Sequence, residues 1–291
     1  MRYGVIYIRA NTILFMMADY EDGIVRSIKK HFVTGIFTAQ SKQKSLSNEG
    51  MTRALDKMAL CLSEAASSRA EPLVFASSGL APASNLLEFL ALCKQKLGVS
   101  IEVLTPEAEA EAVFLGAAGK DGRVIDVGES TTSLVMGSGG NVSKVSLVPL
   151  GHENAMMQFG SADDALFRLR NWILDKQGDL LREFASQNST VYAVSGTATT
   201  MAVLSRFSSR YSSELVHGQE LKANSMAKTS ELLGTMSINE RMQLPILYGR
   251  AEIIRYGAAI LLACMEGMGV TSVRVSDCGA MEGYLIRKAE K

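Results

Sequence analysis

The sequence predicts an α/β fold made of two lobes. Strand-like and helix-like segments alternate along the whole chain, a pattern typical of sheets covered by helices. The chain has 291 residues, 47% of them hydrophobic, enough to bury a sizeable core at a length where one core usually splits into two. The strand pattern that opens the chain also restarts near its middle, so we expect lobes at 1–118 and 119–291.

The first lobe opens with β-rich segments. Residues 3–18 favour two strands joined by a tight bend at 9–12, and a third strand is expected at 31–40. The polar stretch 41–50 predicts a surface loop, and apolar spacing over 51–62 predicts an amphipathic helix. The order is therefore strands first and helix second.

Alternating strands and helices complete this lobe. Strands are expected at 72–79 and 101–105, each followed by a helix, at 84–98 and 106–119. The second of these helices has proline at its first position, where the helix needs no N–H donor. The lobe should end at this helix.

The second lobe repeats the opening of the first. Within 123–151, two strand-like runs flank the letters GEST and return through a glycine-rich turn, as in a hairpin. The pattern then predicts a helix at 163–187, a strand at 191–196, a long apolar helix at 250–265 and a last strand at 272–277. We interpret the repeated opening as an internal duplication.

Composition narrows the classes of partner. Thirty basic and thirty acidic side chains cancel, so the sequence predicts neither a nucleic-acid nor a membrane partner. The apolar stretch 256–270 is interrupted by Glu266 and is too short to cross a bilayer. The four cysteines form no CxxC pair, which argues against a zinc site or a disulfide framework. The N-terminus lacks a signal peptide's apolar segment, so we expect a cytoplasmic protein, whose assembly could extend to a homodimer.

Three segments place small residues directly after a β-rich run: IYIRANT at 6–12, VIDVGESTT at 124–132 and VSGTATT at 194–200. In a two-lobed α/β protein, strand ends from both halves face a shared crevice, and tight loops there offer backbone N–H groups to anions. Each loop alone is equally compatible with a plain connection. Their joint order favours a phosphate-binding site.

These segments resemble the exopolyphosphatases and guanosine pentaphosphate phosphatases, which carry loops of the type DIGSNS, DIGGGSTE and GGTATT in the same order. YIRANT, DVGESTTS and SGTATT correspond to them, while FASSGLAPASN resembles ATSALRDAKN and PEAEAEAVFLG resembles SGEEEARLIYLG. VSDCGAMEG is likewise similar to SDRGLREG, and the matches extend from residue 4 to residue 285. The resemblance implies an actin-like fold, with two ribonuclease H-like lobes and a central cleft.

The resemblance also implies an activity, the hydrolysis of terminal phosphoanhydride bonds of inorganic polyphosphate or guanosine pentaphosphate. Glu109 matches the glutamate that activates water in this family; read without the resemblance, it belongs to a solvated acidic helix face with Glu107 and Glu111. Asp126 matches the second-loop aspartate and would hold Mg²⁺, the implied cofactor, although an aspartate there can also form a turn. Glu129 is a candidate second metal ligand.

The phosphate-binding candidates offer hydroxyls, an amide, a guanidinium or unhindered backbone N–H groups. They are Arg9, Asn11, Ser78, Gly128, Thr131, Thr132, Ser195, Gly196 and Thr197. Among them Arg9 is itself a departure from the family, which has glycine there, and its guanidinium could bind phosphate bidentately.

Several further positions depart from the family pattern. Tyr7 replaces the first-loop aspartate, and Ser133 replaces a glutamate of the second loop. Three family arginines are replaced by Ala81, Glu111 and Met281. Two glycines of the second loop are replaced by Glu129 and Ser130, so we expect costly left-handed turns there.

These departures lead to a main hypothesis and an alternative. The main hypothesis is a phosphoanhydride hydrolase with a degraded active site and weak or specialised activity. The alternative is a non-catalytic sensor that binds a nucleotide or polyphosphate and signals by lobe closure. A sugar or acetate kinase on the same fold matches the remaining segments less well.

Overall fold

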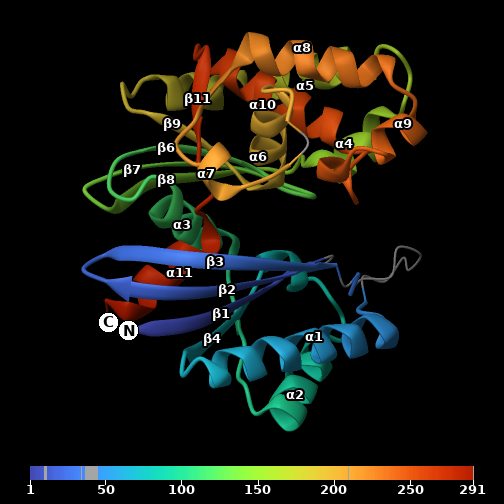
Figure 1. Cartoon of the computed structure of the whole chain (residues 1–291). Helices are drawn as coiled ribbons and strands as arrows, with labels where there is room; N and C mark the ends of the chain where they lie inside the picture. Colours follow the sequence, from blue (N-terminus) through green and yellow to red (C-terminus); the bar gives the residue numbers. More distant parts are fainter. Residues whose placement is uncertain (10–11, 34, 37–44, 209, 291) are drawn as a thin grey trace. The chain divides into compact units, whose positions relative to one another are not determined.

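The computed structural model describes residues 1–9, 12–33, 35–36, 45–208 and 210–290 (Figure 1). It confirms the predicted α/β class, because its helices accompany two mixed sheets. The chain divides into two compact units, the first formed by Met1–Ala112 with Ala280–Lys291 and the second by Val113–Gly279. Each unit contains one of the two sheets.

The first unit contains a sheet with the strand order β3-β2-β1-β4-β5. Its elements are β1 (Arg2–Ile8), β2 (Thr12–Glu21), β3 (Ile24–Val33), α1 (Asn48–Ser67), β4 (Glu71–Ala76), α2 (Leu86–Leu97), β5 (Glu102–Val103), most of α3 (Pro106–Ala117) and α11 (Ala280–Ala289). The first three strands are antiparallel neighbours, whereas β4 runs parallel to β1. The predicted order of strands before helix is therefore confirmed.

The second unit repeats this arrangement in a sheet with the order β10-β11-β9-β6-β7-β8. Its elements are β6 (Gly122–Val127), β7 (Thr132–Ser138), β8 (Asn141–Val148), α4 (His152–Phe159), α5 (Ala165–Ala185), β9 (Val191–Val194), α6 (Ser195–Leu204), α7 (Ser213–Val216), β10 (Glu220–Lys222), α8 (Ala223–Thr235), α9 (Ile238–Met242), α10 (Ile254–Gly267) and β11 (Ser272–Val275). Again three antiparallel strands come first, and β9 runs parallel to β6. The restart of the pattern is thus a repeat of strand topology.

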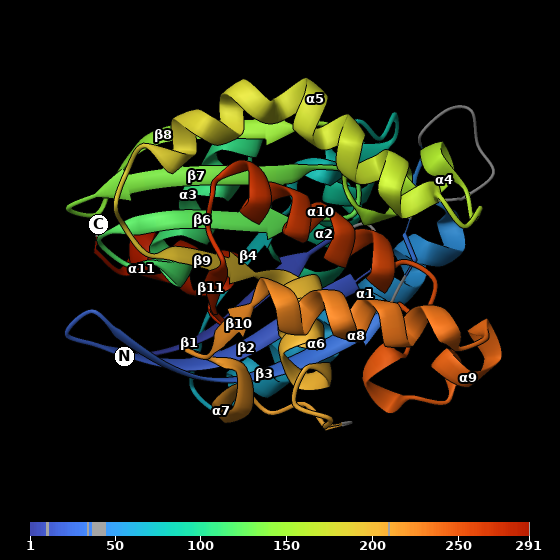
Figure 2. The same ribbon diagram turned by 90° about the horizontal axis from the view of Figure 1, so that it is seen from above.

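Helices bury both cores. In the second unit the apolar helix α10 packs between α5 and α8, as Figure 2 shows. In the first unit α1 packs on β1, β2 and β4, and its Met51 and Met58 lie in the core, as their helical spacing predicts. Within the described part of the chain, no helix has both the length and the apolarity needed to cross a membrane.

The compact units differ from the predicted lobes at the C-terminal segment. We expected 119–291 to form one lobe, but α11 packs in the first unit. The reason is aromatic packing: Tyr284 of α11 stacks on Phe75 of β4, with 4.1 Å between ring centroids, and Phe75 stacks on Tyr7 of β1 at 4.5 Å. The division along α3 falls after Ala112, six residues before the expected boundary at 118.

Candidate active site

The candidate base Glu109 lies in the first turn of α3. The Tyr7 hydroxyl donates a hydrogen bond to its Oε1. The Ser77 hydroxyl lies 2.9 Å from Oε1 and 3.1 Å from Oε2, and the backbone N–H of Ser78 donates to Oε2 at 2.8 Å. Three donors from two strand ends therefore fix both carboxylate oxygens.

This environment separates Glu109 from its neighbours along the helix. Glu107 and Glu111 are exposed, as a solvated acidic face requires, whereas Glu109 is only partly exposed. The interpretation as a solvated face therefore fits Glu107 and Glu111 but not Glu109.

The strand register explains why these donors converge. Tyr7 of β1 pairs with Phe75 of the parallel strand β4, so the two strands end side by side, and the Ser77 N–H donates to the Ile8 carbonyl at 2.9 Å. Tyr7 is buried, and this burial, with the nearby charge of Glu109, raises its pKa well above the ordinary value for tyrosine. The phenol therefore stays protonated at neutral pH and remains a donor.

The other predicted residues of the first unit lie around these strand ends. Arg9 follows β1, donates its backbone N–H to the Thr12 carbonyl at 2.8 Å, and its positive charge acts on Tyr7 in the direction that lowers the tyrosine pKa. Ser78 opens a single 3₁₀ turn and contacts Glu109 through its backbone N–H. Asn11 lies outside the described residues.

The second loop, 128–131, is closed by a hydrogen bond from the Gly128 N–H to the Thr131 carbonyl at 2.9 Å. The first residue of α4 also binds the loop, because the His152 N–H donates to the Gly128 carbonyl at 3.0 Å. Thr132 is fully buried and its hydroxyl donates to the Leu150 carbonyl at 2.7 Å, which ties the loop to its surroundings. Thr131 is exposed.

The expectation of left-handed turns in the second loop was wrong. Neither Glu129 nor Ser130 has a positive φ. Helix α4 binds the carbonyls of both residues: the Glu153 N–H donates to the Glu129 carbonyl at 2.9 Å and the Asn154 amide donates to the Ser130 carbonyl at 2.9 Å. Glycine is not required at these two positions.

The third loop, where β9 meets α6, carries the backbone strain instead. Ser195 has φ +67°, a left-handed conformation that few residues other than glycine adopt readily. Thr197 is buried, and a Cβ placed on Gly257 of α10 would lie 2.5 Å from its Oγ1. One guanidinium nitrogen of Arg250 donates to the Gly196 carbonyl at 3.1 Å and lies 2.9 Å from the Thr200 hydroxyl.

Arg250 is a site residue that the sequence reasoning missed. Its spacing from the third loop gives no signal in the sequence, since the contact joins residues 54 positions apart. In the structure its guanidinium binds the first turn of α6 through the Gly196 carbonyl.

Parallel pairing also brings the second and third loops together. Asp126 of β6 pairs with Val194 of β9, so the loops that follow both strands emerge at the same end of the sheet. Asp126, Gly128, Glu129 and Ser195 are all partly exposed there. The predicted site residues thus form two groups, one in each unit.

The donor set limits the kind of metal that could bind. Among the described residues, no three His, Cys, Asp or Glu side chains gather in a way that could hold a metal ion. Magnesium keeps several waters and needs only one or two protein carboxylates, together with substrate phosphates. The carboxylates of Asp126 in β6 and Glu129 in the loop that follows it match this number and type of ligand.

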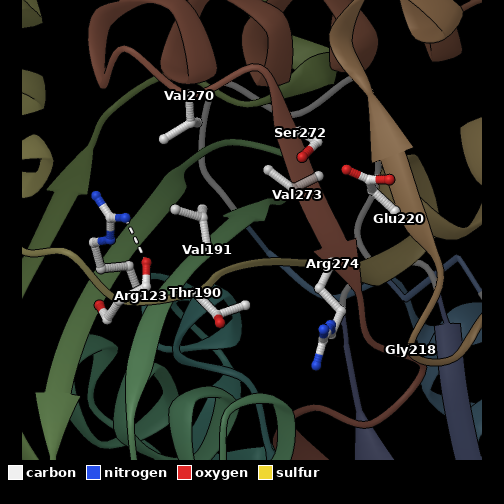
Figure 3. Close-up of a pocket in the computed structure, with 10 residues that line it drawn as sticks. Arg123, Thr190, Val191, Gly218, Glu220, Val270, Ser272, Val273 and Arg274 are labelled. Atoms are coloured by element: carbon white, nitrogen blue, oxygen red, sulfur yellow. Dashed lines mark hydrogen bonds between the residues drawn. The ribbon is translucent and has the colours of Figure 1, made fainter.

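A hollow of about 380 Å³ lies at the opposite end of the second unit's sheet (Figure 3). Arg123 pairs in register with Val191, whereas Arg274 pairs with Tyr192, the next residue, so the two arginines point to opposite faces of the sheet. The guanidinium of Arg123 is also committed to the Phe184 carbonyl, at 2.8 Å. The hollow does not gather cations in the way a phosphate site requires.

The chain belongs to the Ppx/GppA phosphatase family, whose profile matches residues 28–291. A guanosine-5'-triphosphate,3'-diphosphate pyrophosphatase of Vibrio vulnificus is 24% identical over 97% of this chain and 58% of the relative. Exopolyphosphatase 1 of Mycobacterium tuberculosis is 24% identical over 100% of this chain and 89% of the relative. The chain thus spans somewhat more than half of the length of the Vibrio relative.

Solved structures confirm the expected actin-like α/β fold. A Ppx/GppA family member from Aquifex aeolicus superposes with a TM-score of 0.87 at 23% identity, covering 100% of this chain and 98% of that one. An exopolyphosphatase from Cytophaga hutchinsonii gives a TM-score of 0.86 at 17% identity, again with 100% and 98% covered. At these identities the likeness concerns the fold.

Proposed function

We propose that the protein hydrolyses terminal phosphoanhydride bonds of inorganic polyphosphate or guanosine pentaphosphate. Membership of the Ppx/GppA phosphatase family supports a phosphoanhydride hydrolase. The observation that carries the proposal for this chain is the carboxylate of Glu109, held by three donors at the ends of β1 and β4. A general base needs such fixed geometry, because it must lie within hydrogen-bond reach of the water that it activates.

In this proposal the loops of the second unit bind phosphate. The backbone N–H groups of 129–131 and of Ser195–Thr197 would donate to phosphate oxygens, aided by the N-terminus of α6, while the Gly128 N–H keeps the loop closed. Thr132 and Thr197 would act through the backbone, since both side chains are buried. Arg9 would supply a positive charge at the end of β1.

Asp126 and Glu129 would hold Mg²⁺. When bound, the ion would neutralise charge that develops on the phosphate oxygens during transfer to water. Glu109 would orient that water and take its proton. We further propose a cytoplasmic location and a protein without nucleic-acid or membrane partners, with a homodimer as the assembly to test.

We also propose that activity is weak or specialised. Ala81 stands where the family has a phosphate-binding arginine, and a hydrogen bond to a charged group contributes about 1.5–3 kcal/mol. Its loss corresponds to a roughly ten- to hundred-fold weaker phosphate affinity. The same loss favours the alternative, a sensor that binds polyphosphate or a guanosine nucleotide without turnover.

Phosphate release separates the two functions. The purified protein is incubated with Mg²⁺ and either inorganic polyphosphate or guanosine pentaphosphate, alongside Glu109→Gln, which keeps the side-chain shape. Release that falls at least about a hundred-fold in Glu109→Gln supports the hydrolase, in line with the usual size of general-base effects. Saturable binding of polyphosphate by both proteins, with no release from either, would establish the sensor.

A further inference from the structure

We propose that Tyr7 is a positioning residue for Glu109, holding one carboxylate oxygen so that a single acceptor site remains for the attacking water. The inference rests on the proposed function, because it requires Glu109 to act as a base. It gives a role to Tyr7, which stands where the family has its first-loop aspartate.

The Glu109 carboxylate accepts hydrogen bonds from three groups. A carboxylate offers about four lone-pair sites. Tyr7 and Ser77 each have one hydroxyl proton, and Ser78 has one backbone N–H. Ser77 lies within reach of both oxygens, but its single proton serves one at a time. Ser77 also hydrogen-bonds the Tyr7 side chain. With the Ser77 proton on the carboxylate, three protons occupy three sites, and about one site stays open for a water molecule.

The donor side chain of Tyr7 is rigidly held. Tyr7 is 6% exposed and its ring stacks on Phe75 with an interplanar angle of 10°, while Phe75 stacks on Tyr284 from the other side. A ring held in such a stack cannot turn its hydroxyl away without losing buried contacts. Since burial keeps the phenol protonated, the donor is constant across neutral pH.

Tyr7 limits the arrangements in which Glu109 can bind a water molecule. With Ser77 and Ser78 alone, the carboxylate would have a second open site on Oε1 and could turn about its last bond. Water would then be bound in more than one arrangement. Fixing a base in one geometry lowers the barrier of the chemical step, whereas substrate binding does not depend on it.

The competing explanation is that the Tyr7 hydroxyl only anchors α3 to the sheet. Tyr284 provides the matched control, because it belongs to the same aromatic stack and its hydroxyl also bonds a glutamate, Glu102, at 2.7 Å. Tyr7→Phe and Tyr284→Phe each remove one hydroxyl and keep the ring. Only the first touches Glu109.

The test measures kcat and KM for phosphate release from inorganic polyphosphate with Mg²⁺. Tyr7→Phe should lower kcat by about ten- to a hundred-fold, the range expected for a hydrogen bond to a charged group, with KM within about twofold. Tyr284→Phe should leave both within about twofold of wild type. An unchanged kcat in Tyr7→Phe, or an equal fall in both variants, would overturn the positioning role while the hydrolase stands.

A second measurement tests the contact without relying on activity. In a thermal-unfolding cycle, the melting temperature of Tyr7→Phe with Glu109→Ala should fall by less than the sum of the two single changes, because each change removes the same interaction. Tyr284→Phe with Glu109→Ala should be additive. Additivity in both cycles would refute the contact itself. Absence of turnover in wild type would overturn the proposed function, and with it the role of Tyr7 in catalysis.

Discussion

Replacing Ser195 with glycine is expected to stabilise the second unit. Ser195 opens α6 with φ +67°, and an L-residue in this left-handed conformation costs about 1–2 kcal/mol. Glycine removes that cost but gives the unfolded chain more freedom, which offsets about 0.4–1 kcal/mol. The free energy of unfolding should therefore rise by about 0.5–1 kcal/mol, which for a unit of this size corresponds to roughly 1–4 °C in melting temperature.

Ser225 of α8 provides a matched control for this change. Both serines are partly exposed, and the carbonyl of each accepts a threonine hydroxyl four residues later, at 3.0 Å from Thr199 and at 2.9 Å from Thr229. Ser225 has no positive φ, so Ser225→Gly should lower the free energy of unfolding by about 0.5–1 kcal/mol. Differential scanning fluorimetry of both variants gives the comparison, and a fall of the melting temperature in both would refute the strain at Ser195.

Two more predictions concern stability. Burial opposes the ionisation of Glu102, but hydrogen bonds from Lys288 and Tyr284 outweigh it and lower its pKa. The stabilisation is complete above the unfolded pKa of Glu102 and is lost as pH falls through its lower folded pKa. As the pH is lowered from 7 to 3, the melting temperature should therefore fall more steeply in wild type than in Glu102→Gln. Parallel curves of melting temperature against pH would contradict this. Gly257→Ala should lower the free energy of unfolding in urea by about 1–3 kcal/mol, because the new Cβ would lie 2.5 Å from Thr197 Oγ1. Thr197→Ala removes that atom and should recover part of the loss, and no recovery would mean that the strain lies elsewhere.

The topology was the most predictable part of this molecule. Residues 3–18 and 123–151 read as similar openings, and both form antiparallel strands followed by a parallel one. Local patterns carry this information, because strand and turn preferences depend on neighbours in sequence. The placement of α11 was less accessible, since it depends on the stack of Tyr284 with Phe75, about two hundred residues away in the chain.

The candidate site was predictable in outline and not in detail. The resemblance identified Glu109 and the loops, and strand pairing brings them to shared ends of each sheet. The hydrogen bond from the Tyr7 hydroxyl to Glu109 had no signal in the sequence, because it joins residues 102 positions apart and the family has aspartate at the position of Tyr7. The support of Ser130 by the Asn154 amide was equally hidden.

The loops also show why a replaced glycine has no fixed cost. Glycine matters where φ is positive, and the second loop holds Glu129 and Ser130 without any such angle, while Ser195 of the third loop takes one. Replacing glycine therefore strains the backbone at Ser195 but not at Glu129 or Ser130. Only the conformation that the surrounding hydrogen bonds impose decides between them.

This distinction bears on where the proposed weakness of the enzyme originates. The second loop accommodates its replacements, and Tyr7 engages the carboxylate that a lost aspartate would have neighboured. Two positions that hold arginine in the family have no charge of their own: Ala81 is apolar, and Met281 is 5% exposed within the apolar cluster that contains Tyr284. If activity is weak, as we propose, we expect the weakness to lie in the neutralisation of substrate phosphates, which affects binding of a polyanion more than activation of water.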